Sequence, residues 1–413
     1  MINRFIGNWI EKALKGNKIC VVSGPRQVGK SHLISHLYPK AKTYILDSIK
    51  VKIQLKKDFG FFDGAQTRAL YFFDEVHHLS QWRTFLKNLY DTEHRHNKYI
   101  ASGSSAFELL KKGQGDSLAG RALWLRLLPV TFREFLIYKV PKFQKMLPQP
   151  WDLMDNLTIP SLVMEHEKEI KKYWEIYSDR GGFPEPLLMN NTELRNKWLS
   201  DYKDALLERD LKDITQSKDI ERIYAVFELL CEQVSSRYSL RSIADTLHTT
   251  AVTIKSDIAA LKRLLLIFEI ESFGTRLSKS IRKEKKIYPI DSSILKLTDA
   301  VYDNAGPYFE TEVATSLYKH MNYFSLGKTQ KAHLTYYRDY EHREVDFLLS
   351  YNKNTFLIES KLKIKNFSTS INYLHENNIS RFKGIIVTKD GPYERIAEKQ
   401  ITIPIHLLAA SLY

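Results

Sequence analysis

The residues best suited to chemistry lie near the N-terminus, where the chain reads Gly-Pro-Arg-Gln-Val-Gly-Lys-Ser from Gly24 to Ser31. This spacing, G-x-x-x-x-G-K-[ST], is that of a phosphate-binding loop. Gly24 and Gly29 permit backbone angles that other residues avoid, so main-chain N–H groups can approach phosphate oxygens. Lys30 places a positive charge on the β- and γ-phosphates, and the Ser31 hydroxyl is a ligand for Mg²⁺. The pattern predicts binding of ATP together with Mg²⁺.

The sequence on either side of this loop predicts a strand before it and a helix after it. Residues 18–23 are mostly apolar, and residues 32–37 follow a helical pattern. A helix that begins at Lys30 directs the positive end of its dipole at the bound phosphates. The residues that we expect to contact the nucleotide are Gly24, Pro25, Arg26, Gln27, Val28, Gly29, Lys30, Ser31 and His32.

Two adjacent acids end a second apolar run, Ala69-Leu-Tyr-Phe-Phe-Asp-Glu75. A continuous apolar run is typical of a strand that is buried on both faces. We expect Asp74 to hold Mg²⁺ through water and Glu75 to orient or deprotonate the water that attacks the γ-phosphate. Because Ser31 and Asp74 are far apart in the sequence, this assignment predicts that the fold brings them together around one ion.

Ser104 and Arg121 are the other side chains that we place near the phosphates. Residues 98–104 predict a short strand, and Ser104, in preference to Ser102, would set a hydroxyl beside the γ-phosphate. The other interpretation is a strand followed by an ordinary turn. Arg121 follows a glycine-rich stretch at residues 111–119. It either stabilises phosphate charge, from its own chain or from a neighbour in a homo-oligomer, or serves as a structural ion-pair partner.

A second set of chemically capable side chains lies near the C-terminus. Asp346 begins an apolar run, and Glu359 and Lys361 lie two residues apart in another, on the same face of a strand. This pattern resembles the metal site of restriction-endonuclease-like nucleases. That resemblance implies that Asp346 and Glu359 bind Mg²⁺, while Lys361 positions or helps deprotonate a water that attacks phosphorus. Glu310, on a preceding amphipathic helix, completes the acidic set in preference to Glu312.

The C-terminal set also has a simpler interpretation. An alternating strand naturally places Glu359 and Lys361 together as a surface ion pair. Against this, Asp346 is embedded in an apolar run, where an unpaired carboxylate would be costly. The two alternatives are a nuclease centre, competent or formerly competent, and an inherited scaffold used for binding.

The sequence between the two sets predicts a helical lid and a winged helix. The lid, at residues 141–212, is interrupted by a turn at Gly181-Gly-Phe-Pro184 and would close over the nucleotide. Residues 213–290 show two helical patterns joined by a tight turn, then two strand-like runs. Residues 276–286, between those runs, carry six basic residues and one acid.

This winged-helix segment has two interpretations. In one it binds DNA, with the second helix in the major groove and the basic loop on phosphates. The basic residues available on that helix are Lys255, Lys262 and Arg263. In the other interpretation the segment packs between domains, beside the ATPase core.

Size and composition narrow the remaining choices. The chain has 413 residues, which favours two to four domains, and a formal net charge of +14, which favours nucleic acid over a membrane as partner. Its two cysteines are far apart and fit neither a disulfide framework nor a metal site. We find no membrane-spanning stretch and no signal-peptide pattern. These features predict a cytoplasmic protein.

The ordered series GPRQVGKS, FFDEVHHL, ASGSS, SLAGR and LLPVTFREFL, followed by DRGGFP from Asp179 to Pro184, resembles a family of prokaryotic AAA-type ATPases. The C-terminal domain of that family looks like restriction-endonuclease folds. The resemblance covers nearly the whole chain. It implies nucleotide binding by an AAA-like core and leaves the biological role open.

The predicted fold class is α/β, in four parts. An AAA-like parallel-sheet core at residues 1–140 precedes the helical lid at 141–212, the winged helix at 213–290 and a restriction-endonuclease-like α/β domain at 291–413. The predicted function is Mg²⁺-dependent binding and hydrolysis of ATP by a DNA-interacting protein, with a metal-dependent nuclease centre in the last domain. The alternative is a nucleotide-dependent switch that binds a protein partner and carries a non-catalytic C-terminal scaffold.

Overall fold

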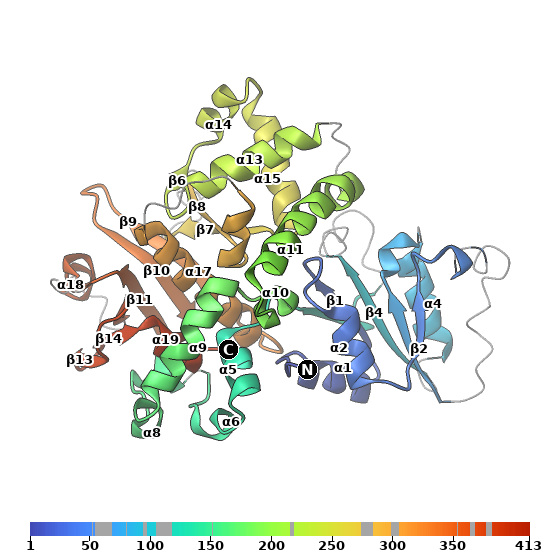
Figure 1. Cartoon of the computed structure of the whole chain (residues 1–413), viewed down its shortest axis with the longest axis horizontal. Helices are drawn as coiled ribbons and strands as arrows, with labels where there is room; N and C mark the ends of the chain where they lie inside the picture. Colours follow the sequence, from blue (N-terminus) through green and yellow to red (C-terminus); the bar gives the residue numbers. More distant parts are fainter. Residues whose placement is uncertain are drawn as a thin grey trace. The chain divides into compact units, whose positions relative to one another are not determined.

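The computed structural model describes residues 1–51, 53, 68–79, 81–93, 97–104, 118–150, 152–214, 219–273, 284–298, 305–352, 354–363, 368–376 and 382–413. Within them the chain forms two compact units (Figure 1). The N-terminal unit comprises Asn3–Pro129 with Arg263–Leu265, and the C-terminal unit comprises Met1–Ile2, Val130–Lys262 and Leu266–Tyr413. Most of the predicted glycine-rich stretch and of the basic wing loop lies outside the described residues.

A five-stranded parallel sheet forms the N-terminal unit, with its strands in the order β2-β3-β4-β1-β5. The strands are β1 (Ile19–Gly24), β2 (Lys42–Ile45), β3 (Leu70–Asp74), β4 (Lys98–Ser104) and β5 (Ala122–Arg126). The helical elements are α1 (Gly7–Lys15), α2 (Lys30–Leu37), the short 3₁₀ turn η2 (Val76–His78) and α4 (Trp82–Glu93). The predicted α/β fold with a parallel-sheet core is confirmed.

Apolar side chains on the central strands hold this sheet in place. β1 is buried along its whole length, as expected for a strand covered on both faces. Tyr71 and Phe73 of β3 and Tyr99 of β4 share one cluster with Phe85 and Leu86 of α4. Because the carboxyl ends of parallel strands meet at one edge of a sheet, the segments that follow β1 and β3 lie along the same edge.

The C-terminal unit resumes at Val130 and continues with a series of helices. The sequence analysis places the end of the first domain later, at residue 140. Val130 is held at both ends of its peptide unit, since its N–H donates to the Gly182 oxygen at 2.7 Å and its oxygen accepts from the Tyr177 hydroxyl at 2.6 Å. The helices are α5 (Phe132–Lys139), α6 (Phe143–Met146), α7 (Asp152–Asn156), α8 (Ser161–Met164), α9 (Glu167–Arg180), α10 (Pro184–Leu188), α11 (Thr192–Ala205), the π-helical turn η4 (Leu206–Asp210) and α12 (Leu211–Ile214).

The next segment contains the two helices and the two strands that the sequence predicts within residues 213–290, together with a helix and a short strand that it does not predict, α13 and β6. Its elements are α13 (Ile220–Glu232), β6 (Arg237–Tyr238), α14 (Leu240–Thr246), α15 (Ala251–Arg263), β7 (Ile267–Ser272) and β8 (Lys285–Pro289), followed by the 3₁₀ turn η5 (Ser292–Leu297). β8 pairs antiparallel with both β7 and β6. β7 also pairs in parallel with β9, so this hairpin is continuous with the sheet that follows.

A nine-stranded sheet therefore runs through the C-terminal unit, in the order β13-β14-β12-β11-β10-β9-β7-β8-β6. Its remaining strands are β9 (His333–Arg338), β10 (Glu344–Tyr351), β11 (Asn354–Lys361), β12 (Phe382–Thr388), β13 (Glu394–Ala397) and β14 (Gln400–Pro404), and its helices are α17 (Ala305–Phe324), α18 (Thr369–Glu376) and α19 (Ile405–Ser411). The sequence predicts two separate domains, divided at residues 290 and 291. The shared sheet joins them instead.

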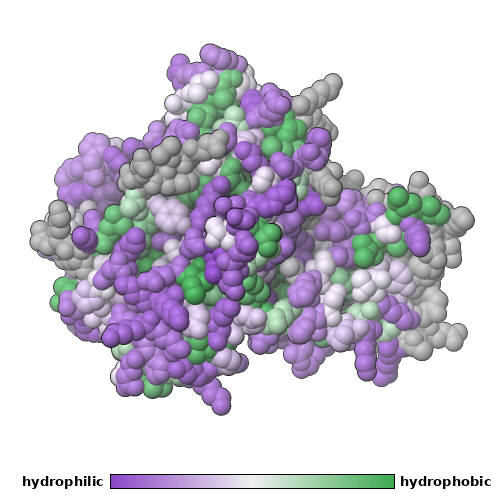
Figure 2. Space-filling view, viewed as in Figure 1, coloured by the Kyte–Doolittle hydropathy of each residue, from purple (hydrophilic) through white to green (hydrophobic). Residues whose placement is uncertain are grey.

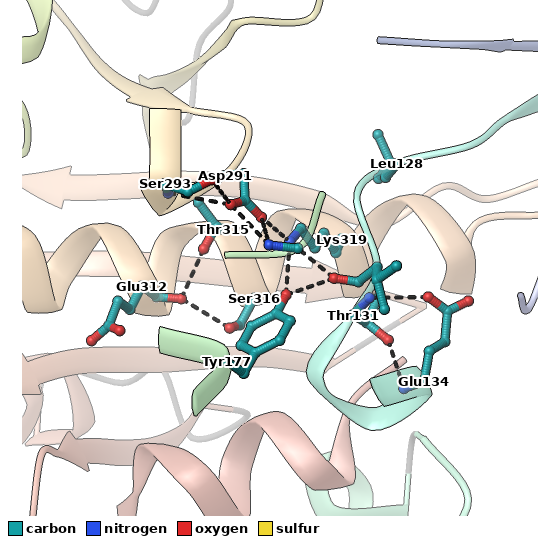
Figure 3. Close-up of polar contacts among 12 residues, drawn as sticks. Leu128, Thr131, Glu134, Tyr177, Asp291, Ser293, Glu312, Thr315, Ser316 and Lys319 are labelled. Atoms are coloured by element: carbon teal, nitrogen blue, oxygen red, sulfur yellow. Dashed lines mark hydrogen bonds and ion pairs between the residues drawn. The ribbon is translucent and has the colours of Figure 1, made fainter. Parts of the chain in front are cut away.

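A buried ion pair joins Lys319 of α17 to Asp291, and Lys319 also contacts Tyr177 of α9 (Figure 3). Lys319 Nζ lies 2.7 Å from Asp291 Oδ2 and donates to the Tyr177 hydroxyl at 3.0 Å. Asp291 in turn accepts from the main-chain N–H of Gly182 at 3.1 and 3.0 Å. Gly181 has φ of +73°, and a Cβ atom there would lie 2.4 Å from Asp291 Oδ1. The DRGGFP segment is thus a packing element, which accounts for its two glycines.

The surfaces of both units are mainly hydrophilic on the face shown in Figure 2, with apolar side chains in separate small groups. Cys20 and Cys231 are both free thiols in buried positions, and burial raises the pKa of each. In the described part of the chain, no helix has the length and apolar character that crossing a membrane requires.

Candidate functional site

The phosphate loop, residues 24–31, leaves the end of β1 and runs into α2. Gly24 has no room for a side chain, since a Cβ atom there would lie 2.3 Å from the main-chain oxygen of Leu127. Gly29 takes a left-handed conformation with φ of 92°, which glycine adopts without steric cost. Both glycines are therefore required by the path of the backbone.

Lys30 opens α2 and turns its side chain back into the loop. Its Nζ donates to the main-chain oxygens of Gly24 at 3.1 Å and Pro25 at 3.0 Å, and the residue is only 6% exposed. These acceptors are neutral, so they hold the ammonium in the loop without cancelling its charge. Ser31 lies half-buried in the first turn of the same helix. Among the other predicted loop residues, Pro25 and Val28 are buried, Arg26 is half-buried, and Gln27 and His32 are exposed.

Asp74 ends β3, with β4 lying between this strand and β1. It is buried and accepts a hydrogen bond at Oδ1 from the Ser102 hydroxyl of β4. Ser104 ends β4 in register with Gly24, and its side chain lies outside the described residues. The serine that contacts the acid is therefore Ser102. The role of Ser104 at the γ-phosphate stays a prediction.

Glu75 follows Asp74 in a left-handed conformation, with φ of 53°, which turns the chain from β3 into η2. Burial raises the pKa of Glu75 above its ordinary value, Lys30 opposes that rise, and the carboxylate of Asp74 adds to it. The effect of Lys30 on Glu75 means that the two groups are within electrostatic reach of each other. The phosphate loop and the acid pair thus share one edge of the sheet.

His77, which was not among the predicted site residues, faces Glu75 from η2. Its Nδ1 lies 3.3 Å from Glu75 Oε2. Both atoms are shut off from solvent, and neither has a hydrogen-bond partner among the described residues. Burial, with the positive charges of His78 and Lys30, lowers the pKa of His77 to about 4, so its imidazole is neutral at pH 7. Its one signal in the sequence is its position two residues after the acids.

Arg121 lies at the opposite edge of the sheet. Its main-chain oxygen accepts from the N–H of Ile19, the first residue of β1, whereas the phosphate loop follows the last residue of that strand, roughly 20 Å away. Its Nε lies 2.7 Å from Asp91 Oδ1. The expectation that Arg121 stabilises phosphate charge in its own chain is therefore corrected, because the length of β1 separates them. The ion pair with Asp91 is the contact of the Arg121 side chain that bears on its predicted role.

Arg126, by contrast, lies at the edge of the sheet that carries the phosphate loop. It ends β5 in register with Ser23 of β1, next to the start of the phosphate loop. The sequence analysis did not single it out, because an arginine inside an apolar strand belongs to no motif. Only the register of β5 against β1 brings it to this edge.

A group of charged side chains in the C-terminal unit contains the second predicted site, and we call it the acidic cluster. Its members are Glu310 of α17, Glu344 and Asp346 of β10, Glu359 and Lys361 of β11, and Lys286 of β8. Asp346 Oδ2 accepts from the N–H and the hydroxyl of Ser360, at 2.8 and 2.7 Å. Lys361 Nζ lies 2.5 Å from Glu359 Oε1. The fold thus gathers Glu310, Asp346, Glu359 and Lys361, which the sequence predicts as one set.

Lys286 corrects the interpretation of the basic loop. The sequence places it among the phosphate-contacting residues 276–286, but it lies inside β8 with a side chain only 3% exposed. Its Nζ is 2.7 Å from Glu344 Oε1 and 3.3 Å from Glu310 Oε1. The neighbouring Lys285 pairs with Glu271 at 2.9 Å. Lys286 is therefore held by internal carboxylates, since a buried ammonium needs an opposite charge, whereas the pair of Lys285 with Glu271 is partly exposed.

Glu310 is a member of the acidic cluster whose pKa is clearly raised. Burial, and then the carboxylate of Asp346, raise the pKa of Glu310 to about 7, although Lys286 and the Tyr288 hydroxyl oppose the rise. That hydroxyl donates to Glu310 Oε1 at 2.6 Å. Burial likewise raises the pKa of Asp346. Protons and lysines, rather than solvent, therefore balance much of the negative charge in the cluster.

The two regions differ in how well they suit Mg²⁺. Ser31 and Asp74 offer hydroxyl and carboxylate oxygens, the hard ligands that Mg²⁺ takes beside substrate phosphates. In the acidic cluster the oxygens are also of the right type, yet no three His, Cys, Asp or Glu side chains of the described residues are placed to hold a metal ion together. Lys286 pairs with Glu310, and Ser360 donates to Asp346. The assignment of Asp346 and Glu359 as Mg²⁺ ligands, with Glu310 completing the acidic set, stays a prediction.

The predicted DNA-contacting helix, α15, keeps only part of its predicted basic surface. Lys255 and Arg263 are exposed. Lys262 is not available, because its Nζ forms an ion pair with Glu269 of β7. The remaining basic residues of the predicted wing loop, before residue 284, lie outside the described residues.

Comparison with known families divides the chain into three parts. Residues 16–136, which contain the phosphate loop and the acid pair, match the family model of an AAA domain. Two domains of unknown function match further on, DUF8612 over residues 170–301 and DUF4143 over residues 305–408. The second of these contains every carboxylate of the acidic cluster, while Lys286 falls within the first.

Two uncharacterized proteins of Methanocaldococcus jannaschii are similar to this chain. MJ1637 is 27% identical over 344 residues, which cover 75% of this chain and 70% of that protein. MJ1544 is 25% identical over 427 residues, which cover 95% of this chain and 87% of that protein.

Solved structures with some likeness include a Walker-type ATPase of Pyrococcus abyssi, at 15% identity and a TM-score of 0.42, covering 72% of this chain and 95% of that one. The Orc1 protein of Aeropyrum pernix, in complex with DNA, has 11% identity and a TM-score of 0.29, with 68% and 87% covered. At these scores neither likeness supports a conclusion about function.

Proposed function

We propose that residues 16–136, which match the family model of an AAA domain, bind and hydrolyse ATP with Mg²⁺, in a protein that interacts with DNA. The observation that carries the first part is the grouping of Lys30, Asp74 and Glu75 at one edge of the parallel sheet. Hydrolysis of the γ-phosphate needs a positive charge, a carboxylate at the metal and a base for water. Lys30, the buried Asp74 and Glu75 would supply these three groups in that order.

Each residue has a defined task in this proposal. Lys30 exchanges its bonds to loop carbonyl oxygens for bonds to phosphate oxygens, and the glycine-rich backbone of the loop donates its N–H groups. Ser31 and Asp74 would hold Mg²⁺, which when bound neutralises charge that develops on the phosphates. Glu75 orients the attacking water and accepts its proton. A pKa raised by burial makes Glu75 a stronger base than an ordinary glutamate.

The test is ATP turnover by the full chain and by Glu75→Gln, each with Mg²⁺ and with excess EDTA. We expect wild-type turnover to stop in EDTA, and Glu75→Gln to lose kcat by about 100-fold or more while ATP affinity changes little. Turnover that survives chelation would remove Mg²⁺ from the proposal. An unchanged kcat in Glu75→Gln would remove Glu75 as the base.

The interaction with DNA is supported by charge. The chain carries a formal net charge of +14, and α15 exposes Lys255 and Arg263 on a helix that follows a tight turn after α14. Such a surface contacts phosphates without needing to read bases. Binding should therefore weaken steeply at higher salt, because the release of counterions from the DNA is then less favourable.

The DNA proposal is tested by filter binding to duplex DNA at rising salt and by ATP turnover with and without that DNA. We expect Lys255→Glu to weaken binding and to reduce the salt dependence, while Lys262→Glu serves as a matched variant on the same helix whose side chain already pairs with Glu269. Binding that is absent, or that ignores salt, would favour the alternative of a switch that acts on a protein partner.

For the acidic cluster, its contacts favour a binding scaffold over a nuclease. Lys286 and Lys361 already pair with carboxylates, and Asp346 is bonded to Ser360. We expect purified protein with Mg²⁺ or Mn²⁺ to leave supercoiled plasmid intact. Nicking by the wild type that disappears in Asp346→Ala would establish a nuclease. Nicking that survives this change would come from another site.

A further inference from the structure

The turn η2, which follows Glu75, the proposed base, contains a feature that the motifs do not explain. η2 directs His77 Nδ1 toward Glu75 Oε2 at 3.3 Å. Each atom is enclosed, and among the described residues each lacks a hydrogen-bond partner. A buried polar atom left without a partner is costly. Two such atoms that face each other are most simply explained as a donor and an acceptor, slightly apart, whose contact closes when the carboxylate moves.

The chemistry of the pair assigns the donor. A neutral imidazole carries one proton, on Nδ1 or on Nε2. A lone pair on Nδ1 would repel the carboxylate oxygen at this distance, whereas a proton there is attracted to it. The proton of His77 therefore belongs on Nδ1. Glu75 can only accept when it is ionised, which is the state that a general base needs.

The ring of His77 is fixed by its neighbours. Its centroid lies 4.3 Å from that of His78, at an interplanar angle of 32°. Val76, which precedes it, is fully buried and anchors η2 in the core of the N-terminal unit. Glu75 itself begins the turn in a left-handed conformation. The backbone of η2, anchored by Val76, thus holds His77 in place, while the longer glutamate side chain retains its own torsional freedom.

We propose that His77 is a positioning residue, which donates from Nδ1 to the Glu75 carboxylate and fixes the rotamer in which that carboxylate meets the attacking water. The inference rests on the proposed role of Glu75 as the base. It adds a role for a residue next to the acids of the motif. Correct placement of a catalytic group contributes to rate without adding affinity for substrate.

The first measurement compares His77→Leu and His77→Asn, with His78→Ala as the matched control. Leucine removes the donor, and we expect kcat to fall about 10-fold while KM stays within about twofold. Asparagine carries an N–H donor at the same branch point as Nδ1, so it should keep kcat within about threefold of the wild type. His78→Ala leaves the donor in place and should do the same. An unchanged kcat in His77→Leu, or an equal loss in His77→Asn, would overturn the proposal.

A double-mutant cycle separates positioning from structural support. If His77 acts only through Glu75, then adding His77→Leu to Glu75→Gln should cost no further activity, so the two losses should be strongly non-additive. Losses that simply add would mean that His77 supports the fold by another route, and the proposal would fail. If Glu75→Gln alone keeps its kcat, the assignment of the base has failed instead. Melting temperature and ATP binding of each variant identify any that are misfolded.

Discussion

The phosphate-loop edge and the acidic cluster contain similar side chains in opposite electrostatic situations. At the loop edge, Lys30 is bonded to neutral carbonyl oxygens, and Asp74 is bonded to a neutral hydroxyl. In the cluster, Lys286 touches two carboxylates directly. These hydrogen bonds of the first region join a charged group to a neutral one, whereas in the second region opposite charges meet directly. The presence of acids and lysines together therefore does not indicate a catalytic site until their partners are known.

The largest expected effect follows from Lys30→Ala. The loss of this ammonium removes the charge that meets the β- and γ-phosphates, and we expect ATP affinity to fall about 100-fold or more. Isothermal titration with ATP and Mg²⁺ measures it. His36→Ala, an exposed residue in the last turn of the same helix, is the control and should bind nearly as the wild type does. Equal affinity in Lys30→Ala would contradict the difference between the two regions.

Next in size is Lys286→Met in the acidic cluster. This change removes a buried ammonium that pairs with two half-buried carboxylates, Glu310 and Glu344, of which Glu344 keeps its ion pair with Arg338. We therefore expect a loss somewhat below the about 3–5 kcal/mol that breaking a fully buried pair costs. Denaturant unfolding of the full chain, followed by a probe in the C-terminal unit, measures the loss. The adjacent Lys285→Met breaks a more exposed pair and should cost no more than about 1 kcal/mol. If both variants are equally stable, Lys286 does not balance the cluster.

Glu310 makes the stability of the C-terminal unit depend on pH. Its pKa is about 7 when folded and near 4.5 when unfolded, so the folded state holds the proton more tightly. The stabilisation from that proton is complete below pH 4.5 and is lost as pH rises through about 7. We expect Glu310→Gln to flatten the fall in unfolding free energy between pH 5 and pH 8. Glu312, whose pKa is also raised to about 7, contributes separately. The informative quantity is therefore the difference between wild type and variant.

The smallest expected effect is that of Arg121→Ala. Its pair with Asp91 is about one-third exposed on the arginine side, and exposed pairs of this kind contribute little to stability because solvent screens them. Turnover should stay within about twofold of the wild type. A loss of kcat near 100-fold or more, strongest at high protein concentration, would instead show that Arg121 acts on the phosphates of a neighbouring chain.

Local spacing predicted the phosphate loop and the two acids correctly as elements: a strand, a glycine turn and a helix, then an apolar strand that ends in Asp74. Spacing of this kind constrains backbone path over a few residues, which is why it can be read directly. It could not foresee the hydrogen bond from Ser102 to Asp74, or exclude Arg121 from the phosphate edge. Those outcomes depend on strand order and register, which pair β4 and β5 with β1 across long stretches of chain.

Lys286 shows the same limit of prediction from sequence, in the C-terminal unit. In sequence it ends a basic run and resembles a phosphate contact. Its burial follows from the pairing of β8 with β7 and from the helix α17, which carries Glu310 to the same place. No pattern within the run distinguishes Lys286 from the basic residues before it.

The sequence by itself determined the parallel-sheet core and the strand, glycine turn and helix of the phosphate loop, because short-range spacing and apolar runs specify both. Only the tertiary structure decided which charged groups are neutralised. The physical reason is that a charge is balanced by whatever lies within a few ångströms of it, and in a folded chain those neighbours come from strands and helices that are distant in sequence.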